Sequence, residues 1–162
     1  MRAIGIDPGL AATGYAIVEI ADRNAVACTW GCIRTNSKNP IFHRLGTIHE
    51  KICNILQKWS PEILIIEDIF VKKETAWASI RTGEVKGAIY IAAYHFEMRV
   101  LDISPTEVKR ALSGSGRASK EQIEKTVRNI FKIKEKIKPG HASDALAIAL
   151  SGIYRANSFC GT

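Results

Sequence analysis

The sequence predicts an α/β fold in which helices flank a mixed β-sheet. Three observations lead to this prediction. Three apolar segments with strand character come first and are joined by short turns, which implies an antiparallel meander. Two further strands then alternate with segments of helical periodicity. The length of 162 residues suits one domain, residues 1–157, with a short tail at 158–162.

The strands are recognised from apolar runs that stop at turn sequences. The first run stops at Asp7-Pro8-Gly9, and the gap at residues 21–24 suits a hairpin between the second and third runs. The fourth run is apolar throughout, as expected of a strand that is buried on both faces. The five strands are expected at residues 2–6, 13–20, 25–34, 62–66 and 100–103.

The helices are recognised from apolar residues at spacings of three and four and from capping residues. Asn39 is expected to cap the first helix, with Pro40 at its first position. Capping boxes at Ser104 and Ser119 mark the starts of two short helices. Trp77 is expected to pack into the core from the second helix. The longer helices are expected at residues 40 to about 59, 75–98 and 141–157.

Neither membrane insertion nor disulfide bonding is expected. No apolar run approaches the roughly 20 residues that a membrane-spanning helix needs, and the N-terminus lacks the apolar run of a signal peptide. A cytoplasmic location is therefore expected. The four cysteines show neither zinc spacing nor a C-x-x-C pair, so we expect them to be reduced. They are Cys28, Cys32, Cys53 and Cys160.

The net charge of +7 is confined to one part of the chain. Residues 71–139 contain 15 basic and 8 acidic residues, whereas residues 1–70 contain 7 of each. A localised basic surface is typical of proteins that bind nucleic acid, although a solvated lysine-rich surface gives the same composition. Nucleic acid is therefore one of two explanations for the charge.

Four side chains that can bind a metal ion lie where elements begin or end. Asp7 and Glu67 follow the first and fourth strands, while His141 and Asp144 share a face of the last helix. If the two strands are neighbours, both acidic groups point into one region. Clustered carboxylates attract a cation such as Mg²⁺ or Mn²⁺, and two such ions can activate water for phosphodiester cleavage. Taken singly, each residue has a simpler explanation in turn or capping chemistry.

Two segments carry candidate nucleic-acid contacts. Phe70, Lys72 and Lys73 come just after Glu67, and an exposed aromatic ring there can stack on unpaired bases. The turn at residues 113–117 ends at Arg117 and precedes a helix N-terminus, an arrangement that suits a phosphate. An ordinary loop between helices has the same composition.

Seven blocks of sequence, in this order, resemble the RuvC family of Holliday-junction endonucleases. The match covers residues 1 to about 155, and the ordered set is far more specific than any single block. The blocks are residues 5–10 with 13–15, then 31–35, 44–45, 66–70, 83–87, 105–120 and 144–149. Glu84 and Lys86 depart from the family pattern, which has glutamine and arginine there.

The resemblance implies an RNase H-like fold with a five-stranded sheet and an enzyme that cuts four-way DNA junctions. Paired symmetric nicks would resolve such Holliday junctions during recombination and repair. The implied cofactor is Mg²⁺, with two ions per subunit, and Mn²⁺ is a substitute because an imidazole is a softer ligand. The implied partners are a second copy of the chain and branch-migration proteins of the RuvA and RuvB families. The apolar helix at residues 75–98 is the candidate dimer interface.

The resemblance also implies roles for individual residues. Asp7, Glu67 and Asp144 are implied metal ligands, and His141 is implied as a further ligand or a general base. Phe70 is implied to wedge against the junction bases. The implied basic groups are Lys109 and Lys120 near the scissile phosphate. Lys72, Lys73 and Arg117, from the two segments described above, and Lys86 are further candidate DNA contacts.

Three alternatives remain open from the sequence. The first keeps the fold but makes the chain a ribonuclease that processes structured RNA. The second is an actin-like ATPase or sugar kinase, which opens with a similar motif but needs two such domains. The third is a DNA-binding module without catalysis, which would lack metal-dependent cleavage.

Overall fold

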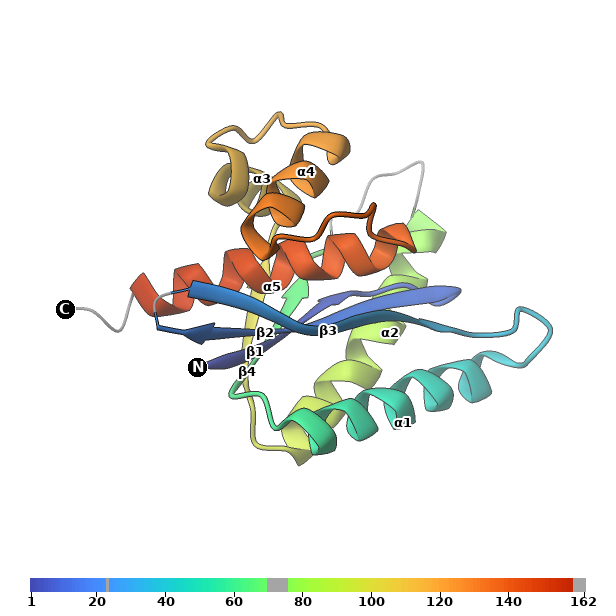
Figure 1. Ribbon diagram of the computed structural model, residues 1–162. Coiled ribbons are helices and arrows are strands. Elements are labelled where there is room, and N and C mark those ends of the chain that lie inside the picture. Colours follow the sequence, from blue (N-terminus) through green and yellow to red (C-terminus); the bar gives the residue numbers. More distant parts are fainter. Residues whose placement is uncertain (23, 70–75, 159–162) are drawn as a thin grey trace.

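The computed structural model describes residues 1–22, 24–69 and 76–158, without the side chains of residues 157 and 158. Five strands form one sheet in the order β3-β2-β1-β4-β5 (Figure 1). The elements in chain order are β1 (Arg2–Asp7), β2 (Ala12–Ala21), β3 (Asn24–Arg34), α1 (Ile41–Trp59), β4 (Ile63–Glu67), α2 (Ala76–His95), β5 (Arg99–Ile103), α3 (Pro105–Ser113), α4 (Lys120–Phe131) and α5 (Gly140–Ser158).

The sheet is mixed, as the sequence predicts. β1 pairs with β2, and β2 with β3, in antiparallel fashion. β1 and β4 pair in parallel, as do β4 and β5. Ile6 lies opposite Ile66 in the first of these parallel pairs. The carboxyl ends of β1 and β4 are therefore neighbours, which is the condition for Asp7 and Glu67 to point into one region.

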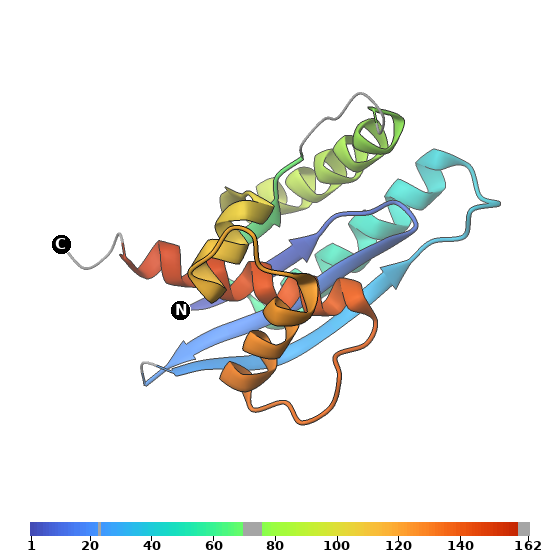
Figure 2. The same ribbon diagram turned by 90° about the horizontal axis from the view of Figure 1, so that it is seen from above.

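Helices cover both faces of the sheet. In Figure 1, α1 lies below the sheet and α2 runs behind it down to α1, whereas α5 lies above the sheet, with α3 and α4 farther out. Figure 2 shows α5 lying over the strands. Side chains of β1 alternate between two cores: Ile4 and Ile6 pack towards α1 and α2, whereas Ala3 packs towards α5. The sheet thus separates two buried apolar layers.

Two glycines allow α5 to approach the sheet closely. A Cβ atom on Gly5 of β1 would overlap backbone atoms of Ala145 and Ala149. A Cβ atom on Gly14 of β2 would overlap the carbonyl group of His141. Only glycine, which has no Cβ atom, permits so close an approach. The approach places the first turn of α5 against the end of β1.

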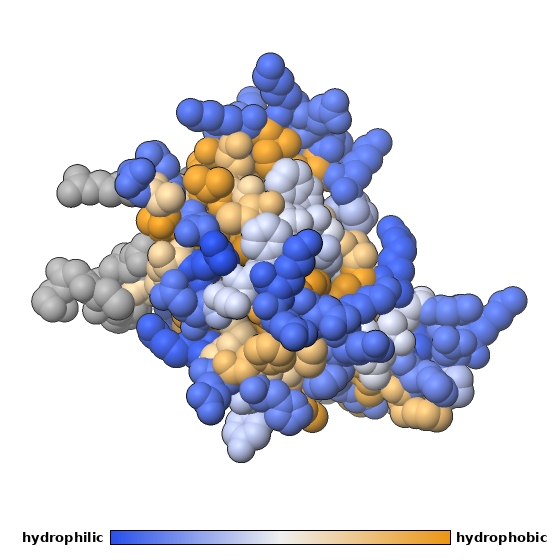
Figure 3. Space-filling model, turned by 60° about the horizontal axis from the view of Figure 1, so that its bottom comes forward, coloured by the Kyte–Doolittle hydropathy of each residue, from blue (hydrophilic) through white to orange (hydrophobic). Residues whose placement is uncertain are grey.

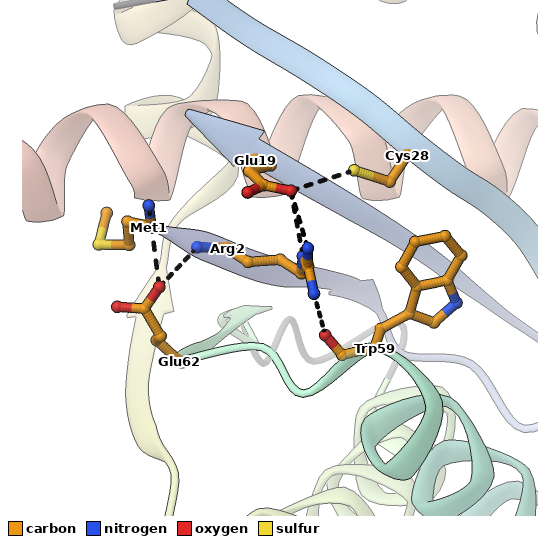
Figure 4. A network of polar contacts seen from close by, with 6 residues as sticks. All are labelled: Met1, Arg2, Glu19, Cys28, Trp59 and Glu62. Atoms are coloured by element: carbon orange, nitrogen blue, oxygen red, sulfur yellow. Dashed lines mark hydrogen bonds and ion pairs between the residues drawn. The ribbon is translucent and has the colours of Figure 1, made fainter. Parts of the chain in front are cut away.

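Arg2 fixes the opposite end of β1 (Figure 4). Its guanidinium donates to the carboxylate of Glu19 on β2 at 2.9 Å and to the carbonyl oxygen of Trp59 at 2.6 Å. Its backbone N–H donates to the carboxylate of Glu62, just before β4, at 2.9 Å. The start of β1 is therefore tied to β2, α1 and the entry to β4.

Three local expectations about the helices are wrong. α1 begins at Ile41 with Pro40 at the cap position, so Asn39 does not cap it. α2 ends at His95, because the chain turns through Glu97 at φ 51° and the Met98 N–H donates to the Ala93 carbonyl. Trp77 is 74% exposed, since the buried residues of α2 begin only at Val85.

The two predicted capping boxes are confirmed. Both capping boxes form, with Ser104 and Ser119 each accepting the N–H of the residue three positions on. None of the helices among the described residues has the length and apolar character needed to span a membrane. Cys28, Cys32 and Cys53 are free, whereas Cys160 lies outside the described residues.

Candidate active site

Three elements bring the predicted metal ligands to one edge of the sheet. Asp7 is the last residue of β1, Glu67 is the last residue of β4, and His141 and Asp144 stand in the first turns of α5. One ligand atom from each of Asp7, His141 and Asp144 lies within 4.8 Å of the others. Glu67 is not a member of this compact group, but its carboxylate interacts with those of Asp7 and Asp144.

Asp7 and His141 are in direct contact within the site. Oδ2 of Asp7 lies 2.7 Å from Nδ1 of His141. Burial raises the pKa of the Asp7 carboxyl, while the hydrogen bond to His141 opposes that shift. Because Asp7 occupies Nδ1, Nε2 of His141 is directed elsewhere and remains able to bind a metal ion or accept a proton.

Glu67 is the predicted ligand whose pKa is shifted most strongly. Burial raises its pKa to about 7, and repulsion from Asp7 and Asp144 adds to that shift. Lys120 and Lys86 oppose the shift. Because Asp7 and Asp144 both raise the pKa of Glu67, the three carboxylates form a region of negative potential that a divalent cation would neutralise.

Lys120 contributes a positive charge at the same edge. Its ammonium donates to Oδ2 of Asp144 at 2.6 Å. The ion pair, together with Asp7 and Glu67, raises the pKa of Lys120, so this side chain stays protonated. The site therefore combines a cluster of carboxylates with a cation at its rim.

The acidic cluster opens into two hollows. A cavity of about 260 Å³ is lined by Glu67, Asp144, Lys109 and Lys120, with apolar walls from α3, α4 and α5. A second cavity of about 310 Å³ lies on the other side of Glu67 and is lined by Asp68, Ile69 and residues of α2. Glu67 thus stands between two accessible spaces.

The predicted DNA-contacting residues fall into three groups. Lys109 and Lys120 line the cavity beside Glu67, and Arg117 is exposed on the loop before α4. Lys86 does not have the environment expected of a DNA contact: it is only 6% exposed and forms ion pairs within the molecule. Phe70, Lys72 and Lys73 lie outside the described residues.

Sequence reasoning missed the partners of Lys86. Its ammonium contacts Asp68, the residue after Glu67, and Asp102 on β5, which also accepts from the Tyr90 hydroxyl. The spacing of Lys86 and Tyr90 by four residues is a signal for a shared helix face. Nothing in the sequence indicates that this face meets two aspartates.

The donor set fits a hard divalent cation. Three carboxylates and one imidazole suit Mg²⁺ or Mn²⁺, and the shared negative potential at Glu67 gives an independent reason for a cation there. A mixed sheet with carboxylates at adjacent strand ends and on a packed helix defines a metal-dependent nuclease of the RNase H-like class.

Comparison with known proteins places the chain within one family of that class. The family model described as crossover junction endodeoxyribonuclease RuvC matches residues 3–152. The chain therefore belongs to the RuvC family of crossover junction endodeoxyribonucleases. The match confirms the resemblance inferred from the ordered sequence blocks, and nothing in the comparisons favours the RNA-processing alternative.

Individual relatives agree over nearly the whole chain. A crossover junction endodeoxyribonuclease RuvC of Finegoldia magna is 36% identical over 155 residues, covering 95% of this chain and 93% of the relative. The structure of Thermus thermophilus RuvC has a TM-score of 0.89 at 32% identity and covers 98% and 97% of the two chains. T. thermophilus RuvC in complex with a Holliday junction substrate has a TM-score of 0.92, also at 32% identity, with coverage of 98% and 96%.

Proposed function

We propose that this chain resolves four-way DNA junctions by metal-dependent hydrolysis, with Asp7, Glu67, His141 and Asp144 as its catalytic residues. The observation that carries the proposal is the convergence of these side chains from β1, β4 and α5 at one sheet edge. A junction substrate is supported by the structural relative in complex with a Holliday junction. The paired nicks would restore two separate duplexes during recombination and repair.

The four side chains are assigned to binding Mg²⁺, with Mn²⁺ as a substitute. Two ions held there would supply an activated water and would neutralise the charge on the leaving oxygen. Asp7 orients the imidazole of His141 through their 2.7 Å hydrogen bond. That contact leaves Nε2 of His141 to act as a ligand or as a proton acceptor.

Basic residues next to the carboxylates are assigned to the scissile phosphate and its neighbours. Lys109 and Lys120 line the cavity beside Glu67, where each can neutralise a phosphate oxygen. Arg117, exposed before α4, extends this positive edge. Phe70, Lys72 and Lys73 stay predictions as contacts to the junction centre.

A junction cleavage assay tests the proposal. A labelled synthetic four-way junction should acquire paired nicks with Mg²⁺ or Mn²⁺, whereas plain duplex DNA should remain uncut. Asp7→Asn should abolish the nicks while junction binding persists, because the amide keeps the shape but loses the charge. Asp22→Asn, at an exposed turn, is the matched control and should cut like the parent. Cleavage by Asp7→Asn at the parental rate would contradict the metal assignment.

A homodimer is the second part of the proposal. A groove between α1 and α2 is lined by Leu45, Gly87, Ala88 and Ile91, and apolar residues also reach the surface elsewhere on α2. Figure 3 brings this side of the molecule forward and shows apolar residues between hydrophilic ones. A two-fold dimer would match the approximate two-fold symmetry of a four-way junction and set two sites on opposite strands. We therefore assign α1 and α2 to the dimer interface.

The remaining assignments follow from the substrate. Branch-migration proteins of the RuvA and RuvB families are the proposed partners, because resolution follows movement of the branch point. A cytoplasmic location is proposed because the DNA substrate lies there in bacteria. A pull-down with purified RuvA and RuvB on junction DNA tests the first assignment.

A further inference from the structure

Lys86 is a buried lysine whose acidic partners are a residue of β5 and the residue that follows β4. Its ammonium donates to Oδ1 of Asp102 on β5 at 2.6 Å and to Oδ1 of Asp68 at 3.3 Å. The Tyr90 hydroxyl, one turn further along α2, donates to the same oxygen of Asp102 at 2.6 Å. One cation therefore links α2 to the end of β4 and to β5.

The anchored residue, Asp68, directly follows the catalytic Glu67. Its backbone N–H donates to the carbonyl of Ile103 at 2.9 Å, and its carboxylate accepts the N–H of Ile69 at 2.8 Å. Glu67 itself is paired with Ile103 at the end of the parallel ladder. The position of Glu67 is thus set by the strand on one side and by Asp68 on the other.

The energetics favour a positional role over a purely stabilising one. Burying an ammonium costs several kcal/mol, and an apolar side chain of similar volume often gives equal or greater stability at such a position. What an apolar side chain lacks is a directed contact with both aspartates. The lysine also reduces the repulsion that Glu67 experiences from neighbouring carboxylates.

We propose that Lys86 is a positioning residue, whose bridge between Asp68 and Asp102 holds the end of β4 so that Glu67 meets the metal ion. The inference rests on the proposed function, because it presumes that Glu67 is a ligand. It replaces the sequence-based expectation that Lys86 contacts DNA.

The test compares four variants with the parent. Lys86→Met keeps the length but removes the charge, and Lys86→Arg keeps a charged donor. In Lys86→Met, Asp102 keeps its charge but loses its ammonium partner. The double variant Lys86→Met/Asp102→Leu removes that aspartate as well. Lys125→Met, at an exposed lysine of α4 that does not line the cavity beside Glu67, is the matched control. Thermal denaturation establishes that each variant is folded.

Three quantities are then measured: the affinity for Mn²⁺ without DNA by calorimetry, the affinity for a four-way junction in EDTA, and the single-turnover cleavage rate. For Lys86→Met we expect about 10-fold weaker Mn²⁺ binding and at least 10-fold slower cleavage, the usual effect of losing a group that orients a ligand. Junction affinity should stay within about twofold of the parent. Lys86→Arg should recover most of the loss, and Lys125→Met should match the parent.

The double variant separates positioning from stability. It should unfold near the parental temperature yet remain slow and weak in Mn²⁺ binding. Parental Mn²⁺ affinity and cleavage in either variant that lacks Lys86 would overturn the proposal. So would a loss of junction affinity that accounts for the slower cleavage, since Lys86 would then act on DNA. If the parent binds Mn²⁺ but leaves junctions uncut, the proposed function fails while the Mn²⁺ titrations still decide the role of Lys86.

Discussion

Glu67 is the residue at which stability and function oppose each other. Burial and two neighbouring carboxylates raise its pKa to about 7, above its value in an unfolded chain. Between these two pKa values the folded state holds a proton that the unfolded state has lost. Stability therefore falls as the pH rises from about 4.5 to about 7, and it stays lower above that range.

Glu67→Gln should accordingly stabilise the metal-free protein. In EDTA at pH 8 we expect the free energy of unfolding to rise by about 1–2 kcal/mol, allowing for partial screening by solvent. At pH 5 the gain should be much smaller, because the parental carboxyl is then largely protonated in the folded state. Urea denaturation at both pH values measures the difference. An equal gain at both values would show that the charge of Glu67 is not the cause.

Lys120 gives a second prediction at the scale of one residue. Its ammonium lies 2.6 Å from Asp144 and lines the cavity beside Glu67, so we expect it to act on the reacting phosphate. Lys120→Met should slow junction cleavage by about 100-fold, the scale of losing one donor that stabilises a transition state. Junction affinity should change by less than about threefold, because a single phosphate contact is lost.

The control for Lys120 lies on the same helix. Lys125 is exposed on α4 and does not line the cavity. Lys125→Met removes the same charge and should leave the cleavage rate unchanged. Similar losses in both variants would indicate a general electrostatic effect of the basic surface.

Individual residues also show which features of the site the sequence could predict and which it could not. Asp7, Glu67, His141 and Asp144 were recognisable because each follows a strand end or opens a helix, and such positions converge when the strands are neighbours. The surroundings of Lys86 were not recognisable. Its partners, Asp68 and Asp102, are distant in sequence. The pairing of β4 with β5 brings the two aspartates together, and the fold places α2 so that Lys86 reaches both.

At the scale of elements, the close packing of α5 on the sheet depends on the glycines of β1 and β2 that it contacts. Gly5→Ala should lower the free energy of unfolding by about 2–3 kcal/mol, because its Cβ would overlap backbone atoms of α5. Cleavage should fall as well, since α5 carries His141 and Asp144. Urea denaturation and the junction assay measure the two effects.

Gly46→Ala is the matched substitution in a helix. A Cβ atom there meets nothing within 4 Å, so the variant should gain about 0.5–1 kcal/mol through its higher helix propensity. The comparison is made on stability alone, because Gly46 also lines the groove between α1 and α2. A neutral Gly5→Ala would mean that α5 is free to move away from β1.

Helix boundaries were predicted well where local chemistry sets them. Ser104 and Ser119 form the capping boxes that their sequences indicate, because each box involves only four consecutive residues. The end of α2 and the exposure of Trp77 were not predicted. Both depend on where the helix leaves the core, and apolar residues on an exposed helix face have the same periodicity as buried ones.

At the scale of the whole molecule, the groove between α1 and α2 predicts self-association. Ile91 lines the groove and is 54% exposed in the single chain. Ile91→Glu should convert the dimer to a monomer, because a carboxylate would be buried without a partner. Sedimentation measures the mass, and the junction assay should show unpaired nicks in place of paired ones.

Val26→Glu provides the comparison for this variant. Val26 is similarly exposed, at 47%, but lies on β3 and not in the groove. The variant should remain dimeric and should cut both strands. Dissociation of both variants, or of neither, would place the interface elsewhere.

The position of α5 in the chain determines when the enzyme can become active during its synthesis. Asp7 emerges first, whereas His141 and Asp144 belong to the final helix and dock over Gly5 and Gly14 only after everything between them has been translated. An unfinished polypeptide on the ribosome therefore lacks two of the four proposed metal ligands.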